Sequence, residues 1–165
     1  MKAPPEHDLG FAKVDLHRKI RRGFPEVIFA KGKSLSQIVS IAQVLRAKGQ
    51  PAVITKLNPS LFEELARRLP WLAFFPKAQM AAGPAVGFKR RVTYRGFVLV
   101  ITAGTGDIPV AEEAVVTLKL MGTGVRTLFD VGVAGLHRLL KHGRLLASAR
   151  AIVVVAGMDG ALPSV

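Results

Sequence analysis

The sequence predicts an α/β protein, with a small N-terminal α/β domain followed by an incomplete parallel three-layer domain. Three short strand-like runs, at residues 97–102, 125–129 and 151–155, alternate with segments of helical pattern. The first of them contains only apolar or β-branched residues, which is typical of a parallel strand that is buried on both faces. A glycine-containing turn follows each run or lies close behind it, so we expect a βαβαβ order with one parallel sheet.

Two helix starts in the first part of the chain carry clear capping signals. Ser34, with Gln37 three residues later, has the pattern of a capping box. Asn58 is a good N-cap residue, and the following Pro59 suits the first position of a helix. Strands are expected at residues 26–30 and 52–55. The order strand, helix, strand, helix indicates a small α/β unit.

The start of the chain has a weaker pattern. Residues 1–12 are expected to be a loose leader without regular structure. Residues 14–22 are expected to form a short helix, with Val14, Leu16 and Ile20 on one face and basic side chains on the other.

Domain boundaries follow from composition and charge. Residues 71–88 are dominated by Pro, Gly and Ala, and we expect a linker with room for one strand. We therefore place a basic N-terminal domain with its linker at residues 1–88 and the parallel domain at residues 89–165. Residues 89–95 are expected to be an edge strand or hairpin arm. Most of the 24 Lys and Arg residues precede Gly96, so the net charge of +13 belongs mainly to the first half.

Composition excludes several classes of protein. Half of the residues are hydrophobic, which indicates a globular chain, and no apolar run approaches the roughly 18 residues of a membrane span. The N-terminus lacks the apolar segment of a secretory signal, and there is no cysteine, so we expect a cytoplasmic protein. With one Tyr and one Trp beside scattered basic residues, nucleic acid is not an expected partner. An anionic small ligand or a general solubility charge explains the basic character equally well.

Candidate site residues gather in the turns after the three later strands. The carboxyl ends of parallel strands meet at one edge of a sheet, which is where open α/β sheets bind ligands. A glycine turn that opens a helix can also bind an anion through its unpaired N–H groups. For each residue, the alternative is a plain turn or cap; for His137, it is an exposed helical histidine. The candidates in these turns are Gly104, Thr105, Gly106, Asp107, Asp130, Gly135, His137 and Asp159.

A second group of candidates is basic and lies in the first half. These side chains bracket the turn before the helix at Ser34 and could hold an anion, although most Lys and Arg residues are simply solvated. The group consists of Arg18, Arg22, Lys31 and Lys33. The four histidines have no metal-ligand spacing, and no metal or resident cofactor is expected.

The end of the sequence leads to one further expectation. A sheet of three parallel strands is small for this architecture and leaves an edge and part of a face uncovered. We expect a truncated chain whose missing part completes the sheet; the alternative is that a partner subunit covers it.

Four motifs resemble one known family. VDLHRKIRRGFPEVIFAKGKS, AGTGDIPVAEEA, FDVGVAGLHRLL and VVVAGMDGALPSV are similar to the LarB family of nickel-pincer cofactor biosynthesis, over nearly the whole chain from Asp15. The resemblance implies a second domain similar to the PurE phosphoribosylaminoimidazole carboxylases, which is flavodoxin-like. It also implies an enzyme, a carboxylase and hydrolase that adds CO2 or bicarbonate to the pyridinium ring of nicotinic acid adenine dinucleotide and releases AMP. A homo-octamer built from the carboxylase-like domains is implied as well.

For that chemistry, we expect particular roles for individual residues of the turns and of the basic group. Asp107, Asp130, His137 and Asp159 are the expected catalytic residues; Gly104, Thr105, Gly106, Gly135 and the four basic residues of the first half are expected to bind the substrate. Within the catalytic group, we expect Asp107, together with Thr105, to orient the ligand, Asp130 to position it, His137 to handle phosphate or protons, and Asp159 to act as acid or base.

This sequence departs from the family pattern in three places. The family has a nucleophilic cysteine beyond the ALPSV motif, usually Ser at the place of Gly106, and usually Glu at the place of Asp159. We therefore expect these residues alone to be inactive. Two alternatives stay open: a PurE-like aminoimidazole ribonucleotide carboxylase or mutase, which typically lacks a long basic N-terminal domain, and a non-catalytic nucleotide-binding remnant.

Overall fold

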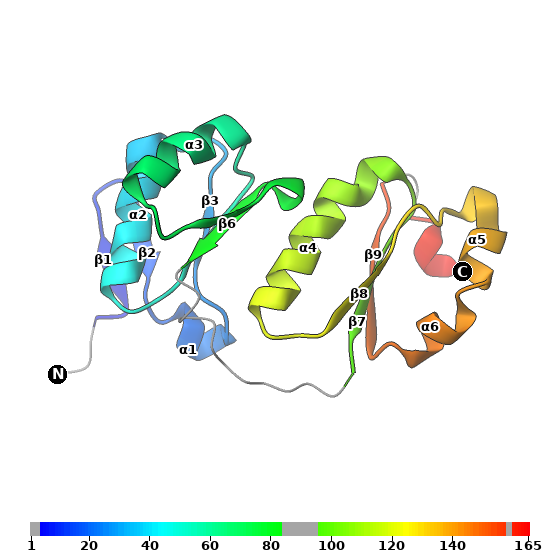
Figure 1. Cartoon of the computed structure of the whole chain (residues 1–165). Coiled ribbons are helices and arrows are strands. Elements are labelled where there is room, and N and C mark those ends of the chain that lie inside the picture. Colours follow the sequence, from blue (N-terminus) through cyan, green and yellow to red (C-terminus); the bar gives the residue numbers. More distant parts are fainter. Residues whose placement is uncertain (1–3, 84–95, 158–159) are drawn as a thin grey trace. The chain divides into compact units, whose positions relative to one another are not determined.

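The computed structural model describes residues 4–83, 96–157 and 160–165 (Figure 1). The chain divides into two compact units, Met1–Lys89 and Arg90–Val165. Both units combine helices with sheets, which confirms the predicted α/β class. The predicted edge strand at residues 89–95 and the exact domain boundary lie outside the described residues. Within the described part, no helix has the length and apolar character needed to cross a membrane.

The N-terminal unit is built on a four-stranded mixed sheet in the order β3-β4-β6-β5. β3 and β4 are parallel, whereas β6 runs antiparallel to both of its neighbours. The elements of this unit are β1 (Glu6–Asp8), β2 (Lys13–Asp15), α1 (Arg18–Arg22), β3 (Val27–Phe29), α2 (Leu35–Ala47), β4 (Ala52–Thr55), α3 (Pro59–Arg68), β5 (Ala73–Phe75) and β6 (Met80–Gly83).

Both predicted caps are confirmed. The Ser34 hydroxyl accepts a hydrogen bond from the Gln37 backbone N–H at 3.3 Å, and the Gln37 side chain accepts one from the Ser34 N–H at 2.9 Å. The Asn58 side chain accepts from the Leu61 N–H at 2.8 Å. These bonds satisfy N–H groups that have no partner inside the first turn, so α2 and α3 begin where the sequence indicated.

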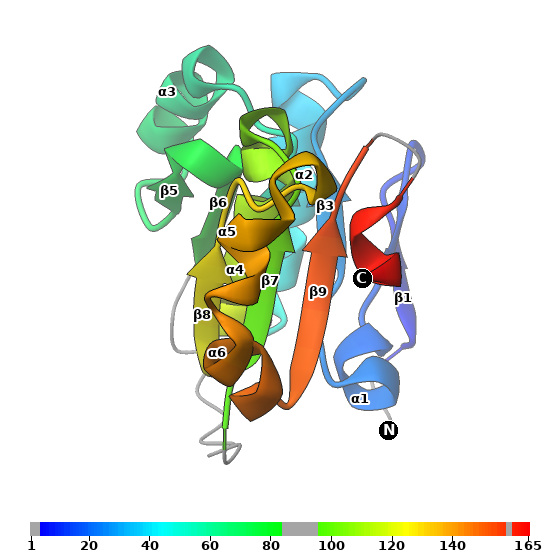
Figure 2. The same ribbon diagram turned by 90° about the vertical axis from the view of Figure 1, so that its right-hand side faces the viewer.

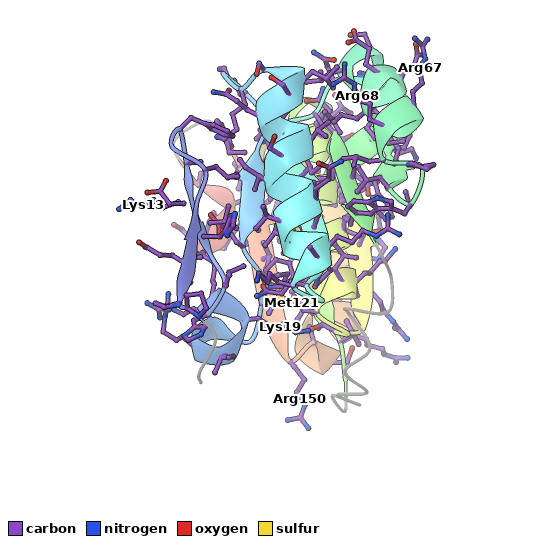
Figure 3. The ribbon with its side chains drawn as sticks, turned by 90° about the vertical axis from the view of Figure 1, so that its left-hand side faces the viewer. Lys13, Lys19, Arg67, Arg68, Met121 and Arg150 are labelled. Carbon is purple, nitrogen blue, oxygen red and sulfur yellow. The ribbon has the colours of Figure 1, made fainter. Side chains whose placement is uncertain are left out.

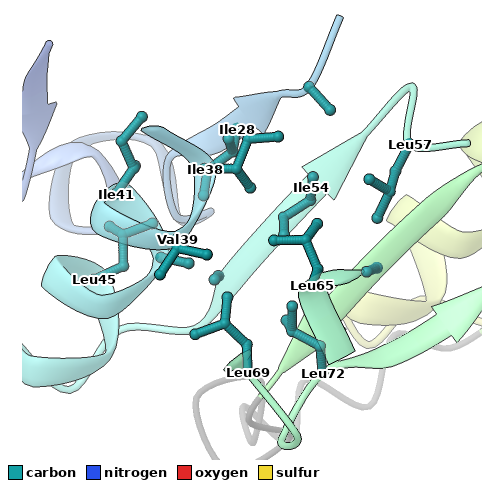
Figure 4. Close-up of a cluster of buried hydrophobic side chains, with 14 of the residues drawn as sticks. Ile28, Ile38, Val39, Ile41, Leu45, Ile54, Leu57, Leu65, Leu69 and Leu72 are labelled. Atoms are coloured by element: carbon teal, nitrogen blue, oxygen red, sulfur yellow. The ribbon is translucent and has the colours of Figure 1, made fainter. Parts of the chain in front are cut away.

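The core of this unit lies between the two long helices and the sheet (Figure 4). Ile38 and Leu45 of α2, Leu65 of α3 and Ile54 of β4 are fully buried. Ile38 and Leu45 are two helical turns apart and therefore lie on the same face of α2. Because most of the stabilising apolar burial of the unit is concentrated there, α2 and α3 are firmly held against β4.

The start of the chain is more ordered than predicted. Instead of a loose leader, residues 6–8 form β1, which pairs antiparallel with β2. Instead of one helix over residues 14–22, Val14 lies in β2 and only Arg18–Arg22 is helical. Val14 in β2 and Leu16 directly after this strand are buried, with Asp15 between them, whereas Ile20 on α1 is 81% exposed.

The expected linker at residues 71–88 is also partly wrong. Two strands, β5 and β6, form an antiparallel hairpin there, and all four residues of β6 are buried. Small side chains suit this central strand. A Cβ on Gly83 would lie 2.4 Å from the Trp71 carbonyl oxygen, so only glycine fits this approach.

The C-terminal unit contains the predicted parallel sheet, in the order β8-β7-β9 (Figure 2). Leu99 and Ile101 of β7 face the side that carries α5 and α6, whereas Val100 packs against α4 (Figure 1). On the edge strand β9, Ile152 is 43% exposed. The elements are β7 (Val98–Thr102), α4 (Ile108–Leu120), β8 (Val125–Leu128), α5 (Leu136–Leu140), α6 (Gly143–Ser148) and β9 (Ala151–Val155).

An ion pair between Asp15 and Arg21 links the β1–β2 hairpin to α1. Partial burial would raise the pKa of Asp15, but hydrogen bonds from the Arg21 side chain and the His17 N–H, together with the positive charge of Arg21, outweigh it and hold this pKa below its ordinary value. The Arg21 guanidinium lies 2.5 Å from the Asp15 carboxylate. A lowered carboxyl pKa stabilises the fold above the ordinary pKa, and this contribution is lost as the pH falls through the folded-state value.

We therefore expect Asp15→Asn to weaken the acid sensitivity of the N-terminal unit. Urea unfolding followed by the fluorescence of Trp71, the single tryptophan, would be compared at pH 7 and pH 3. The native protein should lose more stability between these pH values than the variant does, and Arg22→Gln, a neighbouring charge change on α1, should behave like the native protein. An equal loss in the native protein and in Asp15→Asn would contradict this account.

Candidate functional site

The three parallel strands end at the same edge of the sheet. We call residues 103–107, 130–135 and 156–157, which follow β7, β8 and β9, the carboxyl-end rim. The register pairs Thr102 with Val155, and Ile101 with Leu128, so the three strand ends are level with one another. The predicted gathering of the turns after β7 and β8 on one edge therefore follows from the observed pairing.

Thr102, the last residue of β7, holds two of these turns together. It is fully buried, and its hydroxyl accepts a hydrogen bond from the Asp130 N–H at 2.9 Å. The Thr102 carbonyl accepts from the Val131 N–H at 3.0 Å. On the other side, the Ala103 N–H donates to the Val155 carbonyl at 3.1 Å. Sequence reasoning missed Thr102; the signal was a polar residue at the end of an otherwise apolar buried strand.

Asp107 does not cap α4, which was the alternative to a ligand-binding role for this residue. Its carboxylate accepts a hydrogen bond from the Gly104 N–H at 2.9 Å, and it makes no side-chain cap to α4. A turn of 3₁₀-helix, Thr105–Asp107, precedes α4, so Asp107 closes this turn backwards onto Gly104. Thr105 and Gly106 are exposed at the tip of the turn.

Glycines bring the other turns close to this one. A Cβ on Gly132 would lie 2.8 Å from the Ala103 carbonyl oxygen, which ties the turn after β8 to the turn after β7. A Cβ on Gly157 would lie 3.6 Å from an Asp107 carboxylate oxygen, so the segment after β9 borders the same turn. Around Gly106, by contrast, a Cβ would meet nothing within 4 Å.

Asp130 is held in an unusual backbone conformation by its surroundings. Its φ of +59° lies in the left-handed region, which Asp tolerates better than most residues. Its carboxylate accepts a hydrogen bond from the Arg138 guanidinium at 2.9 Å. That guanidinium lies over Gly135, where a Cβ would come within 2.5 Å of the Arg138 Nε. Arg138 was not predicted as a site residue. The signal that could have found it is that it directly follows the candidate His137 in the same short helix.

The two remaining predicted residues of this domain stand apart from these contacts. His137 is exposed on α5, and among the described residues its side chain has no hydrogen-bond or ion-pair partner. Asp159 lies outside the described residues. In the described part of the chain, no group of three or more His, Asp or Glu residues is arranged to hold a metal ion.

The four predicted basic residues belong to the N-terminal unit. Arg18 and Arg22 are exposed on α1, on either side of the Asp15 partner Arg21. Lys31 is exposed in the turn after β3, and Lys33 donates a hydrogen bond from its ammonium group to the Phe29 carbonyl at 3.0 Å. Lys33 is therefore partly engaged in closing its own turn.

Chemically, the rim is small and mixed in charge. It offers the exposed glycine turn before α4, the carboxylates of Asp107 and Asp130, and the guanidinium of Arg138. A helix start of this kind favours an anion, whereas Asp107 already occupies one N–H group of the turn. The rim can thus orient a ligand by backbone N–H groups and one Arg–Asp pair.

The fold and the rim together define the class: an α/β protein with a parallel sheet whose carboxyl edge is of the kind that binds ligands. Comparison with known proteins narrows the class: residues 6–83 match the family described as LarB/PurE-like N-terminal domain. The N-terminal unit is such a domain, and the predicted recognition of the LarB family is confirmed.

One relative covers both units of the chain. An uncharacterized protein of Methanocaldococcus jannaschii is 38% identical over 159 residues, which cover 93% of this chain and 62% of that protein. The chain thus spans about three fifths of the length of this relative. A LarB/PurE-like domain indicates a carboxylase-related role.

Proposed function

We propose that the chain is part of a LarB-type enzyme that carboxylates nicotinic acid adenine dinucleotide and hydrolyses its phosphoanhydride to release AMP. Two features occur together in this chain and carry the proposal. One is the LarB/PurE-like N-terminal domain, and the other is a parallel sheet with a glycine turn in its carboxyl-end rim, directly before the 13-residue helix α4. Ligands of open α/β sheets bind at this edge, and phosphates favour such helix starts.

Within this proposal, the substrate phosphates lie at the turn formed by residues 104–107. Exposed N–H groups and the Thr105 hydroxyl donate to them, while Asp107 keeps the turn closed through Gly104. Arg138 supplies a positive charge on the neighbouring turn, with its direction fixed by Asp130. His137, one residue earlier, is free to meet a phosphate or to move a proton, and Asp159 keeps its expected acid or base role.

In the proposed reaction, a pyridinium carbon forms a bond to CO2 and loses its proton, and water cleaves the phosphoanhydride. CO2 is apolar and reacts best where water is excluded. We propose that the turn at residues 131–136 lines the CO2 position and excludes water from it. The resemblance assigns the electron supply to a cysteine adduct, and the 165 residues contain no cysteine. The part of the activity that we propose for these residues is therefore substrate binding.

Calorimetric titration of the chain with three ligands tests the proposal. Nicotinic acid adenine dinucleotide should bind more tightly than AMP and than aminoimidazole ribonucleotide. If aminoimidazole ribonucleotide bound most tightly, the PurE-like alternative would replace the proposal. If AMP bound as well as the dinucleotide, a general nucleotide-binding remnant would be the better description.

Gly106→Ser makes the same titration specific to the rim. The added side chain enters open space, so the fold should be unchanged, and its hydroxyl adds a donor beside the proposed phosphate position. We expect dinucleotide affinity to rise by a few-fold, about the value of one added hydrogen bond. Gly143→Ser, which also enters open space but lies at the start of α6, should leave affinity unchanged. Equal effects of both variants would remove the rim from the proposal.

The proposed partner is a further copy of the same chain. The family resemblance suggests a homo-octamer built from the carboxylase-like domains. From the composition, we expect no nucleic acid or membrane partner. Light scattering of the purified chain reports its mass directly.

A further inference from the structure

A hollow of about 380 Å³ lies within the N-terminal unit, beside the last turns of α2 and α3. Its volume falls within the range of small-molecule sites. Gln43, Arg46, Arg68 and Trp71 are among the residues that line it, and no carboxylate is among them. The hollow is thus cationic. None of the candidate site residues that we named from the sequence lines it.

Trp71 gives Arg46 a defined position in the hollow. The Arg46 guanidinium carbon lies 5.0 Å from the centre of a Trp71 ring, a cation–π contact. The Trp71 ring in turn lies close to Gly83 of the buried strand β6, where a Cβ would come within 3.2 Å of the ring atom Cε3. A guanidinium held on a fixed ring loses less conformational freedom when it binds an anion, which is the benefit of preorganisation.

Arg68 supplies a second charge from α3. Among the described residues, neither Arg46 nor Arg68 forms an ion pair with a carboxylate, although Glu64 lies one turn before Arg68 on the same helix. Charges at helix ends often serve only to balance the helix dipole, and Arg67 is in the same last turn. The difference is that Arg68 lines the hollow with Arg46 and Arg67 does not (Figure 3 labels Arg67 and Arg68).

We propose that this hollow binds the phosphate or pyrophosphate group of a small molecule, between the guanidinium groups of Arg46 and Arg68. Two guanidinium groups that form no ion pair within the described part of the chain match a group that carries about two negative charges, and the planar fork of Arg suits phosphate oxygens. Gln43 adds amide N–H donors one turn before Arg46 on α2. The inference concerns the N-terminal unit alone and does not rest on the proposed function.

Titration of the full chain with inorganic pyrophosphate, phosphate and citrate tests the proposal, followed by the amide NMR signals of α2 and α3. Pyrophosphate should shift residues around Arg46 and Arg68. Arg46→Gln and Arg68→Gln should each weaken its binding about tenfold or more, the value of a charged hydrogen bond. Arg67→Gln removes the same charge from the adjacent position and should leave affinity within about twofold.

Each other result overturns the proposal. Loss of affinity that is equal in Arg67→Gln and Arg68→Gln would mean that only the general positive charge attracts the anion. Citrate binding as tight as pyrophosphate binding would contradict the phosphate assignment, and the absence of shifts near the hollow would remove the site. Thermal unfolding of each variant separates binding from folding. Arg67→Gln and Arg68→Gln should match the native protein because these arginines are exposed, and Arg46→Gln should be only slightly less stable because it loses the contact with Trp71.

Discussion

Thr102→Val is expected to loosen the C-terminal unit by about 1–3 kcal/mol, the cost of leaving a buried polar group without its partner. Valine has nearly the shape of threonine, so the packing of this fully buried side chain is retained while the hydroxyl is lost. The Asp130 N–H then has no acceptor at the position that Thr102 supplied. Because Asp130 carries the pair with Arg138, we expect the turn after β8 to move as well.

Hydrogen exchange at the amides of β7 measures this effect within the C-terminal unit, which is necessary because the single tryptophan lies in the other unit. A change of 1–3 kcal/mol corresponds to protection lowered by roughly 5- to 150-fold. Thr102→Ser keeps the hydroxyl and should retain most of the protection of the Asp130 amide. Unchanged protection of that amide in Thr102→Val would show that the hydroxyl does not hold the turn.

Gly132→Ala is expected to displace the turn after β8 from the turn after β7. The new Cβ would lie 2.8 Å from the Ala103 carbonyl oxygen, and because this contact is to backbone, no side-chain rotation can relieve it. Overpacking of this kind costs about 1–3 kcal/mol. We expect the same drop in β7 protection and, in addition, a loss of dinucleotide affinity, because Asp130 and Arg138 move with the turn.

Gly106→Ala is the matched control for this prediction. It adds the same methyl group to the same rim, but nothing lies within 4 Å of its Cβ, and its backbone is not in the left-handed region. Protection should therefore be unchanged. If Gly132→Ala were as harmless as Gly106→Ala, the close approach of the two turns would not be a feature of the folded protein.

The parts of the fold that the sequence predicted well are those governed by local physics. Capping at Ser34 and Asn58 depends on residues within four positions, and β7 and β9 are continuous runs of apolar or β-branched residues. The hairpin at the start of the chain escaped because Val14 and Leu16 fit a helical spacing once Ile20 is included, although their spacing of two is that of a strand. β6 escaped because its residues, MAAG, are small and have little strand preference, and only its neighbours make it a strand.

The candidate site was predictable to the same degree. Parallel strands oblige the turns that follow directly at their carboxyl ends to meet, so the rim followed from the strand pattern. The contacts inside it did not, because they join residues far apart in sequence: Thr102 reaches Asp130 across 28 positions. The alternative role of Asp107, a cap on α4, is not found: its carboxylate accepts from the Gly104 N–H, because a 3₁₀ turn separates β7 from the helix and places the carboxylate beside that N–H.

The central claim is that the carboxyl-end rim binds an anionic dinucleotide, and amide NMR during titration with nicotinic acid adenine dinucleotide tests it most directly. The account predicts that the largest shifts fall on residues 104–107 and 130–135, and that Gly132→Ala weakens them. Shifts confined to the basic N-terminal unit, with the rim amides unmoved at saturation, would contradict it.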